Sequence, residues 1–344
     1  MNHASYDNKE QRTVPHQVTL VIPLRNEEQS LYTLITSIRR QTRSPHEVIL
    51  VDGGSSDRTV EIARELMAGD ARFRLIEAGD ATPGRGRNVG IEAAVHDWIA
   101  LTDAGIQLEP TWLQNLVAVV EADPTVDVVY GHYEPVIRRI FDQSAALTYV
   151  PPRHTRPGGG LTRGPSTASM LIRRHVWSKV GGIPDARAAE DLIFFERIEK
   201  AGFKIGWAAN AIVHWQMAPT LLKTFRRFAL YSKHNVWVGR QRYWHYGIAR
   251  QYLVAVIAVV LAVGLSPWWL LLIPAWLCAR VAKSLWVRRH DTPRRSLFNP
   301  VVWVGVLVIM LTIDLATFVG WGMALMGRPR TGSDSPRQPM GTSA

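Results

Sequence analysis

Short apolar runs alternate with amphipathic segments over the first hundred residues of the chain. The runs VTLVIPL (18–24) and VILV (48–51) are β-type and continuously apolar, which is typical of strands buried on both faces. Between them, residues 31–38 carry leucine and isoleucine at helical spacing. Two further strand–helix steps and a fourth strand, WIAL (98–101), complete the pattern. It predicts an α/β, Rossmann-like fold with a mainly parallel sheet, whose ligands lie beyond the carboxyl ends of the strands.

The pattern loosens from about residue 128. VDVVYGHYEPV (126–136) predicts another strand, and RHTRPGGGLTRGPS (153–166) is a loop rich in glycine and proline. The segment AEDLIFFERI has an apolar helical face, and IGWAANAIVHW (205–215) predicts the last strand of this part. The predicted α/β domain therefore extends over residues 17–220.

The remaining chain is apolar, basic and aromatic. Residues 221–250 mix Leu, Phe, Tyr and Trp with Lys and Arg, which favours an amphipathic helix in the lipid headgroup region. Residues 252–287 are almost continuously apolar and predict a two-helix hairpin that turns at Ser266–Pro267. Residues 300–326 predict one more span, so region 251–327 holds two or three. Asp314 inside that span is either functional or hydrogen-bonded to a neighbouring helix.

The balance of basic and acidic residues also changes between the α/β domain and the remaining chain. Residues 1–199 carry 22 Lys and Arg against 26 Asp and Glu, whereas residues 200–344 carry 18 against 3. Such asymmetry predicts an anionic partner, and the apolar stretches indicate a membrane rather than nucleic acid. The basic segment 288–299 predicts a cytoplasmic loop of a multi-pass protein in the inner (cytoplasmic) membrane, with the α/β domain also cytoplasmic.

The ends of the chain and its cysteine add little to this picture. Residues 1–16 are polar, without the apolar core of a signal peptide, and we expect them to be disordered, like the tail 328–344. Cys278 is alone, which excludes a disulfide framework or a cysteine-rich metal site.

Acidic residues follow several predicted strands. Any single one is more often a turn or helix cap than a ligand. Asp52 differs because it follows VILV directly and precedes two glycines, where a carboxylate can accept hydrogen bonds from a base or from ribose. Arg85 and Arg87 stand near a helix start, where phosphates bind well. The glycines of GRGRNVG (84–90) have the wrong spacing and position for a dinucleotide-binding motif.

Five motifs together resemble family 2 glycosyltransferases with the GT-A fold, over roughly residues 17–215: VTLVIPLRNEE, EVILVDGGSSDRT, GRGRNVGIEAA, IALTDAG and AEDLIFFERI. The resemblance implies that the nucleotide pocket is lined by Pro23, Arg25 and Glu27. It further implies that Asp52 recognises the base and that Asp103 lies beside the diphosphate and its metal. Glu190 and Asp191 match the acids on the acceptor side, with Asp191 as the catalytic base.

The expected chemistry suits these residue types. Inverting sugar transfer needs a base for the acceptor hydroxyl and charge stabilisation for the departing diphosphate, which Mg²⁺ or Mn²⁺ supplies with oxygen ligands. The family usually has two acids at the Asp103 site, but this sequence reads Asp-Ala-Gly, and Gly105 cannot ligate. His214 is a candidate further ligand, or else a core or loop histidine.

These observations predict a membrane-bound enzyme that moves a sugar from a nucleotide-sugar, with a uridine donor favoured, to a lipid or lipid-linked acceptor. Arg87 joins the donor pocket, and Arg163 and Glu190 contact the acceptor. Two alternatives stay open: a synthase that also exports a polysaccharide, and a catalytically inactive GT-A scaffold in the membrane.

Overall fold

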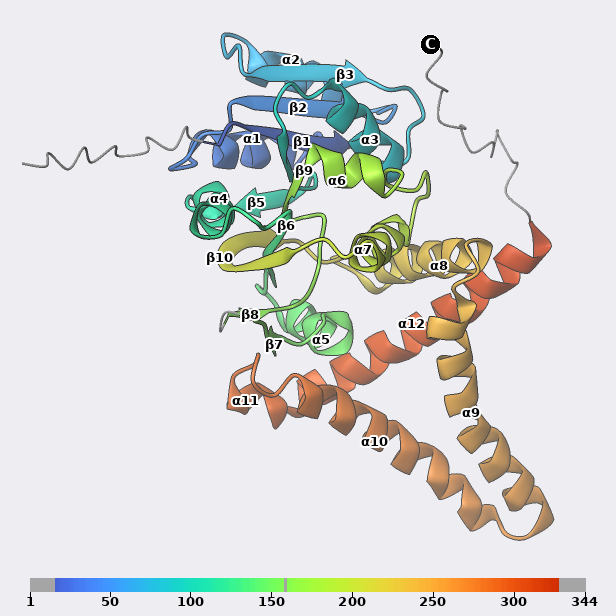
Figure 1. Ribbon diagram of the computed structural model, residues 1–344. Helices are drawn as coiled ribbons and strands as arrows, with labels where there is room; N and C mark the ends of the chain where they lie inside the picture. The colour runs from blue at the N-terminus through green and yellow to red at the C-terminus, as the bar shows by residue number, and fades with distance from the viewer. Residues whose placement is uncertain (1–15, 158–159, 328–344) are drawn as a thin grey trace, which may run out of the picture. The chain divides into compact units, whose positions relative to one another are not determined.

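The computed structural model describes residues 16–157 and 160–327, and its contacts divide the chain into two compact units (Figure 1). The first unit comprises the chain up to Glu134 together with Arg153–Asp185 and Asp191–Gln216. The second comprises Pro135–Pro152, Ala186–Glu190 and the chain from Met217 onwards. The second unit therefore takes in a segment that lies in the middle of the α/β sequence.

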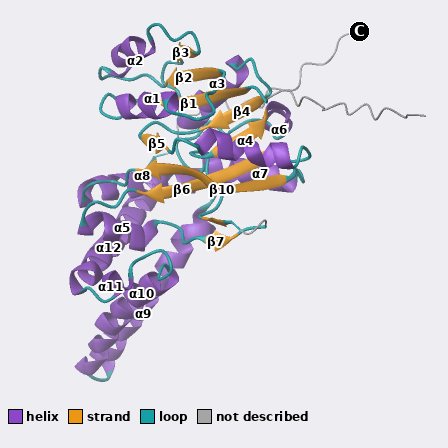
Figure 2. Cartoon of the chain, turned by 90° about the vertical axis from the view of Figure 1, so that its left-hand side faces the viewer, coloured by secondary structure: helices purple, strands orange, loops and turns teal. Residues whose placement is uncertain are grey.

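An eight-stranded sheet in the order β3-β2-β1-β4-β9-β6-β10-β5 forms the centre of the first unit (Figure 2). Its strands are β1 (Val18–Leu24), β2 (Glu47–Asp52), β3 (Phe73–Glu77), β4 (Trp98–Leu101), β5 (Ile106–Leu108), β6 (Val128–Pro135), β9 (Met170–Arg173) and β10 (Ile205–Trp215). A separate short hairpin pairs β7 (His154–Thr155) with β8 (Leu161–Thr162).

The direction of the strands determines which side chains share an edge of the sheet. Strands β3, β2, β1 and β4 are parallel, β9 is antiparallel to β4, and β6 is antiparallel to β9. Strand β6 therefore runs in the same direction as β4. The carboxyl ends of β1, β2, β4 and β6 consequently lie along one edge, as the strand–helix alternation predicts.

Two apolar cores fill the two faces of this sheet. Along β1, Leu20 and Ile22 belong to one core and Val21 to the other, which is the alternation expected of a strand covered on both faces. The helices of the unit are α1 (Leu31–Arg39), α2 (Thr59–Met67), α3 (Pro83–Ala93), α4 (Trp112–Ala122), α6 (Arg174–Lys179) and α7 (Glu190–Lys200). Ile35 of α1 and Phe194 of α7 are fully buried on opposite faces.

The glycines of α3 allow that helix to approach the sheet closely. A Cβ atom at Gly90 would lie 2.3 Å from Val21 Cγ1, and one at Gly86 would lie 3.2 Å from Pro23 Cβ. Helix–sheet packing therefore accounts for these glycines, in agreement with the rejection of a dinucleotide motif.

The second unit is helical. It contains α5 (Ile140–Tyr149), α8 (Leu221–Trp237), α9 (Gln241–Gly264), the 3₁₀ helix η1 (Pro267–Leu271), α10 (Leu272–Val287), α11 (Arg294–Leu297) and α12 (Pro300–Met326). Leu147 of α5 packs in one apolar cluster with Val281 of α10 and Val302 of α12. The region predicted as one interfacial helix, 221–250, is divided between α8 and the start of α9. Gly320 of α12 lies directly against Ala229 and Ser232 of α8.

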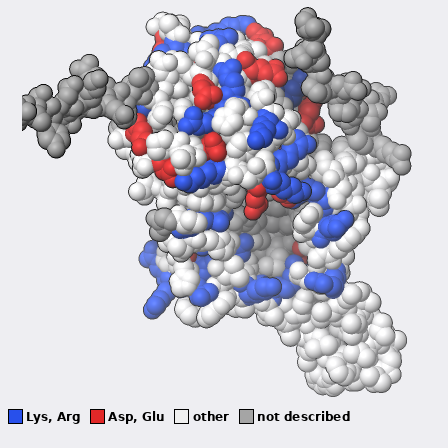
Figure 3. Space-filling model, viewed as in Figure 1, with Lys and Arg blue, Asp and Glu red and all other residues white. Residues whose placement is uncertain are grey.

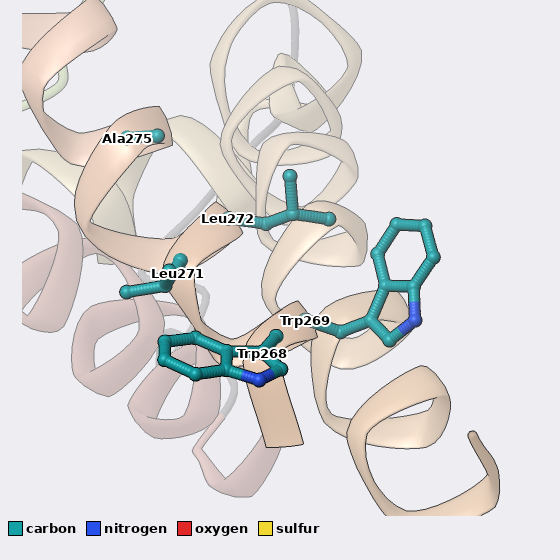
Figure 4. A pocket seen from close by; sticks show the side chains of 5 residues that line it. All are labelled: Trp268, Trp269, Leu271, Leu272 and Ala275. Atoms are coloured by element: carbon teal, nitrogen blue, oxygen red, sulfur yellow. The ribbon is translucent and has the colours of Figure 1, made fainter. Parts of the chain in front are cut away.

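Three helices of this unit are long and apolar enough to cross a membrane: Gln241–Gly264, Pro267–Val287 and Pro300–Met326. The first two form the expected hairpin with its turn at Leu265–Ser266, and the far end of that hairpin is free of Lys, Arg, Asp and Glu in Figure 3. A hollow at the turn is lined by Trp268, Trp269, Leu271, Leu272 and Ala275 (Figure 4). Its walls are suited to lipid chains rather than to polar chemistry.

Candidate active site

Asp52 ends β2 with a side chain that is almost fully buried. Its carboxylate accepts hydrogen bonds from the backbone N–H of Gly54 at 3.0 Å, from that of Ser55 at 3.1 Å, and from the Ser55 hydroxyl at 2.5 Å. Gly54 has φ = +80°, which glycine adopts without strain. The DGGS sequence thus builds a turn that fixes the carboxylate at the edge of the sheet.

Asp103 follows β4 at the same edge and contacts Arg87 of α3. The distance from Arg87 Nη2 to Asp103 Oδ1 is 2.5 Å, and the arginine side chain is 5% exposed while that of the aspartate is 36% exposed. One side of the Asp103 carboxylate is therefore held by a buried cation, and the other is open to a ligand.

Asp191 stands in the first turn of α7, close enough to Arg87 and Asp103 to feel both charges. Burial raises the pKa of Asp191, and Asp103 adds to this, whereas the bond from the Leu192 N–H and the charge of Arg87 act in the opposite direction. A raised pKa favours proton uptake by this carboxylate. Glu190, the residue before it, is buried.

Glu27, just after β1, is a further acid close to Asp103. Burial raises the pKa of Glu27, and the neighbouring charges of Asp57 and Asp103 raise it further, against a hydrogen bond from Ser30. A Cβ atom at Gly105, the position where the family usually has its second acid, would lie 3.6 Å from Glu27 Oε2. The Glu27 carboxylate thus stands next to the place that Gly105 leaves without an acid.

The other two residues predicted in the nucleotide pocket lie on or just after β1. Pro23 belongs to β1 and packs on α3, and the Arg25 guanidinium forms an exposed ion pair with Asp80. Neither contact contradicts a role in nucleotide binding, which stays a prediction.

His214 lies on β10 opposite Gln107 of β5, and its Nε2 atom is 2.5 Å from Glu109 Oε1. Within the part of the chain that the structure describes, no three His, Cys, Asp or Glu side chains are grouped closely enough to hold a metal ion. The structure therefore brings His214 to Glu109 rather than into a preformed metal cluster. Its role as a ligand stays a prediction.

Arg163 follows β8 and is buried, and its Nη2 atom is 2.8 Å from Glu134 Oε2 at the end of β6. The other oxygen of Glu134 is 2.5 Å from His132 Nε2 and 2.6 Å from Arg153 Nη2. Burial acts to raise the pKa of Glu134, but the bonds from His132 and Arg163 outweigh it and lower the pKa to about 2. The sequence pattern identified Arg163 alone. Glu134 lies near the end of the predicted strand 126–136, and this position was the sequence feature that could have indicated it.

Comparison with known proteins supports the fold. In fold, the chain resembles the mannosyltransferase PcManGT from Pyrobaculum calidifontis, solved with GDP-Man and Mn²⁺, with a TM-score of 0.53, 18% identity, and coverage of 89% of this chain and 88% of that one. The α/β unit is a GT-A fold. Residues 19–180 match the model of glycosyl transferase family 2, which agrees with the resemblance that the five motifs indicate.

Curated relatives match over part of their length. EpsJ of Bacillus subtilis, an uncharacterized glycosyltransferase, is 33% identical over 136 residues, which are 40% of this chain and 38% of EpsJ. The O-antigen chain rhamnosyltransferase RfbN of Salmonella typhimurium is 26% identical over 238 residues, which are 65% of this chain and 75% of RfbN. The matched region of EpsJ is thus well under half of that protein.

Proposed function

We propose that the protein is an inverting glycosyltransferase that moves a sugar from a nucleotide-sugar donor to a lipid or lipid-linked acceptor at a membrane. The observation that carries the proposal is the position of Arg87, which forms an ion pair with Asp103 and lies within electrostatic range of Asp191. A cation close to two acids from different elements suits a reaction in which a proton is taken at one acid and a diphosphate departs near the other.

In this proposal the donor lies along the edge where β1, β2 and β4 end. Asp52 recognises the base, Pro23 and Arg25 line the nucleotide pocket, and Arg87 and Asp103 lie beside the diphosphate. A uridine diphosphate sugar is our first choice of donor. The GDP-Man in PcManGT keeps a guanosine donor among those to be tested.

The proposed reaction breaks one bond and forms one. An acceptor hydroxyl gives its proton to Asp191 while its oxygen bonds to the anomeric carbon of the sugar. The bond from that carbon to the diphosphate oxygen breaks, and the electron pair leaves with the nucleoside diphosphate. Arg87 then lies where negative charge grows, in a partly buried site where its field is weakly screened.

The residues present fit a divalent metal that is held mainly by the donor itself. Asp103 offers an open carboxylate with the hard oxygen atoms that Mg²⁺ and Mn²⁺ prefer, and Glu27 stands beside it. His214 is the further candidate ligand if it exchanges Glu109 for the metal. When bound, the metal would supply additional charge stabilisation for the diphosphate.

The membrane part of the proposal rests on the three apolar helices and on the basic residues between α10 and α12. They support a multi-pass protein of the inner membrane with its catalytic unit on the cytoplasmic side. Protease cleavage of the catalytic unit in sealed inside-out vesicles, but not in right-side-out ones, is the expected result.

The activity is tested with full-length protein in detergent, a panel of nucleotide sugars, Mg²⁺ or Mn²⁺, and membrane lipid extract as acceptor source. We expect turnover with one donor and a loss of about 10²–10⁴-fold in Asp191→Asn. Asp123→Asn is the matched control, since Asp123 lies on an exposed loop beside Lys204. A lengthening polymer would favour the synthase alternative, and donor binding without turnover in any lipid would favour the inactive scaffold.

A further inference from the structure

The ends of the β7–β8 hairpin hold two arginines over one carboxylate. His154 pairs with Thr162 in this hairpin, so Arg153 and Arg163, the next residues outward, stand on facing sides of its base. Both guanidinium groups reach Glu134, with one on each carboxylate oxygen. The hairpin thus fixes the spacing of two cations that are ten positions apart in the sequence.

This cluster lies at the same edge of the sheet as the proposed donor site. Glu134 is at the carboxyl end of β6, which runs in the same direction as β4, and Asp103 follows the end of β4. Tyr133 connects the cluster to Asp191: burial raises the pKa of Tyr133 to about 12, and among the charges that act on it are Arg163 and Asp191. Because the proposed function puts Asp191 at the acceptor, we expect the two arginines to lie on the acceptor side as well.

His132 is a third side chain that contacts the Glu134 carboxylate. Its side chain is 4% exposed, and its Nε2 atom must carry the proton, because the ionised Glu134 only accepts hydrogen bonds. The buried Nδ1 atom has no hydrogen-bond partner among the residues that the structure describes. The Nε2–H group can donate to a phosphate oxygen in the same way as it donates to Glu134.

From this arrangement we infer that Arg153, Arg163 and His132 form a binding site for a phosphate or diphosphate group on the acceptor. In the absence of acceptor, the Glu134 carboxylate takes the place of that group. The inference rests on the proposed function, which it narrows to acceptors that carry phosphate.

The chemistry of the groups explains why a carboxylate is present in such a site. A buried guanidinium without a counter-charge is costly, so Glu134 keeps both arginines ordered before the acceptor arrives. A phosphate offers more acceptor oxygens than a carboxylate and up to twice the charge, and the guanidinium fork fits it in two-bonded geometry. Glu134 is 19% exposed, so its position is open to solvent on one side.

The test measures binding alone and does not need turnover. Full-length protein in detergent is titrated calorimetrically with farnesyl phosphate, farnesyl diphosphate, farnesol and inorganic phosphate. We expect farnesyl phosphate to bind about tenfold or more tightly than farnesol, since each charge-assisted bond contributes substantially. Arg163→Gln should remove that difference, and Glu134→Gln should increase it severalfold because the competing negative charge is lost.

Three controls keep the test decisive. Arg64→Gln, which removes an exposed arginine paired with Glu77, should leave all four affinities unchanged. Arg153→Gln removes a partly exposed arginine and reports on the site even if Arg163→Gln does not fold. Uridine diphosphate and guanosine diphosphate, titrated in parallel, should bind the wild type and Arg163→Gln equally.

Three results would overturn the inference. If the nucleotide diphosphates lose affinity in Arg163→Gln, the arginines belong to the donor site. If farnesol and farnesyl phosphate bind alike and the variants only lower the melting temperature, the cluster is structural. If inorganic phosphate binds as tightly as farnesyl phosphate, the site takes free phosphate. A failed proposed function is a separate outcome, because it gives no turnover whatever these affinities are.

Discussion

Each of the two units contains an arginine–aspartate pair, and the two pairs differ in how open the carboxylate is. In the GT-A unit, Arg87 is buried while the side chain of Asp103 is 36% exposed. In the helical unit, Arg280 Nη1 is 2.7 Å from Asp314 Oδ2, and the Asp314 side chain is only 4% exposed. The Tyr252 hydroxyl also donates to Asp314 Oδ2 at 2.8 Å.

This difference distinguishes a proposed binding site from a structural contact. The open carboxylate keeps oxygen atoms available for a metal or a donor, and its arginine partner fixes its direction. The closed carboxylate has its charge and hydrogen bonds satisfied by α9 and α10, and it connects these helices to α12. Of the two interpretations that the sequence left open for Asp314, the structure favours bonding between neighbouring helices.

The largest effect that this comparison predicts is on activity, at the open pair. Asp103→Asn keeps the shape and a hydrogen-bond acceptor for Arg87 but removes the charge that faces the ligand. Transfer should fall by about 10²–10³-fold while the melting temperature stays close to that of the wild type. Steady-state kinetics and thermal unfolding in detergent measure the two quantities. If Asp103→Asn keeps its transfer activity but has a lower melting temperature, Asp103 has a structural role like that of Asp314.

A change at the closed pair should act on stability instead. Arg280→Leu leaves the Asp314 charge buried among apolar helices and should lower the free energy of unfolding by about 3 kcal/mol. Arg280→Leu combined with Asp314→Leu should recover most of that loss, because no charge is left unpaired. Chemical unfolding in detergent checks both variants.

The matched control for this pair is Lys283→Leu, which removes an exposed cation from the same helix and should have little effect. Two results would contradict the structural role. One is a double variant that is as unstable as Arg280→Leu. The other is a loss of transfer activity in variants that lack the charges but keep the stability of the wild type, which would give the intramembrane pair a functional role.

The sequence predicted most of the GT-A unit because its signals are local. Alternating apolar runs and helical spacing located β1 to β4 with their helices, whereas the turn that holds the Asp52 carboxylate was not predicted. Asp103 and Asp191 were predicted as site residues from their motifs, and their roles stay predictions; the nearness of Arg87 to both is visible only in the fold. The predicted hairpin at Ser266–Pro267 and the third apolar helix are confirmed as candidate spans.

The parts that escaped prediction depend on contacts distant in sequence. Arg280 lies within an apolar run, and its importance is visible only once Asp314 and Tyr252 are seen beside it. Glu134, His132 and Arg153 are ordinary residues until the β7–β8 hairpin brings them together. The sequence pattern predicted no element over Ile140–Tyr149, yet this segment is a helix whose Leu147 packs with α10 and α12. No periodicity encodes such packing.

The smallest predicted effect concerns pH and separates two aspartates of the GT-A unit. Burial raises the pKa of Asp191, so the native state binds this proton more tightly than the unfolded state, and stability falls as pH rises through the interval between the two pKa values. Hydrogen bonds from Lys204 and Thr125 lower the pKa of Asp123 to about 2, so this residue stabilises the fold above its unfolded pKa and loses that effect as pH falls.

The same substitution should therefore have opposite signs at the two positions. Near pH 7, Asp191→Asn should raise the melting temperature slightly and Asp123→Asn should lower it slightly. The difference for Asp191→Asn should shrink as the pH falls towards the ordinary range of an aspartic acid, and the difference for Asp123→Asn should shrink only as the pH falls below that range. Thermal unfolding of both variants across this pH range provides the measurement. Transfer by the wild type should also rise with pH as Asp191 loses its proton. If Asp191→Asn instead lowers the melting temperature at neutral pH, the ionised Asp191 carboxylate is stabilised by its partners. The effect of burial on the pKa of Asp191 would then not be the dominant one.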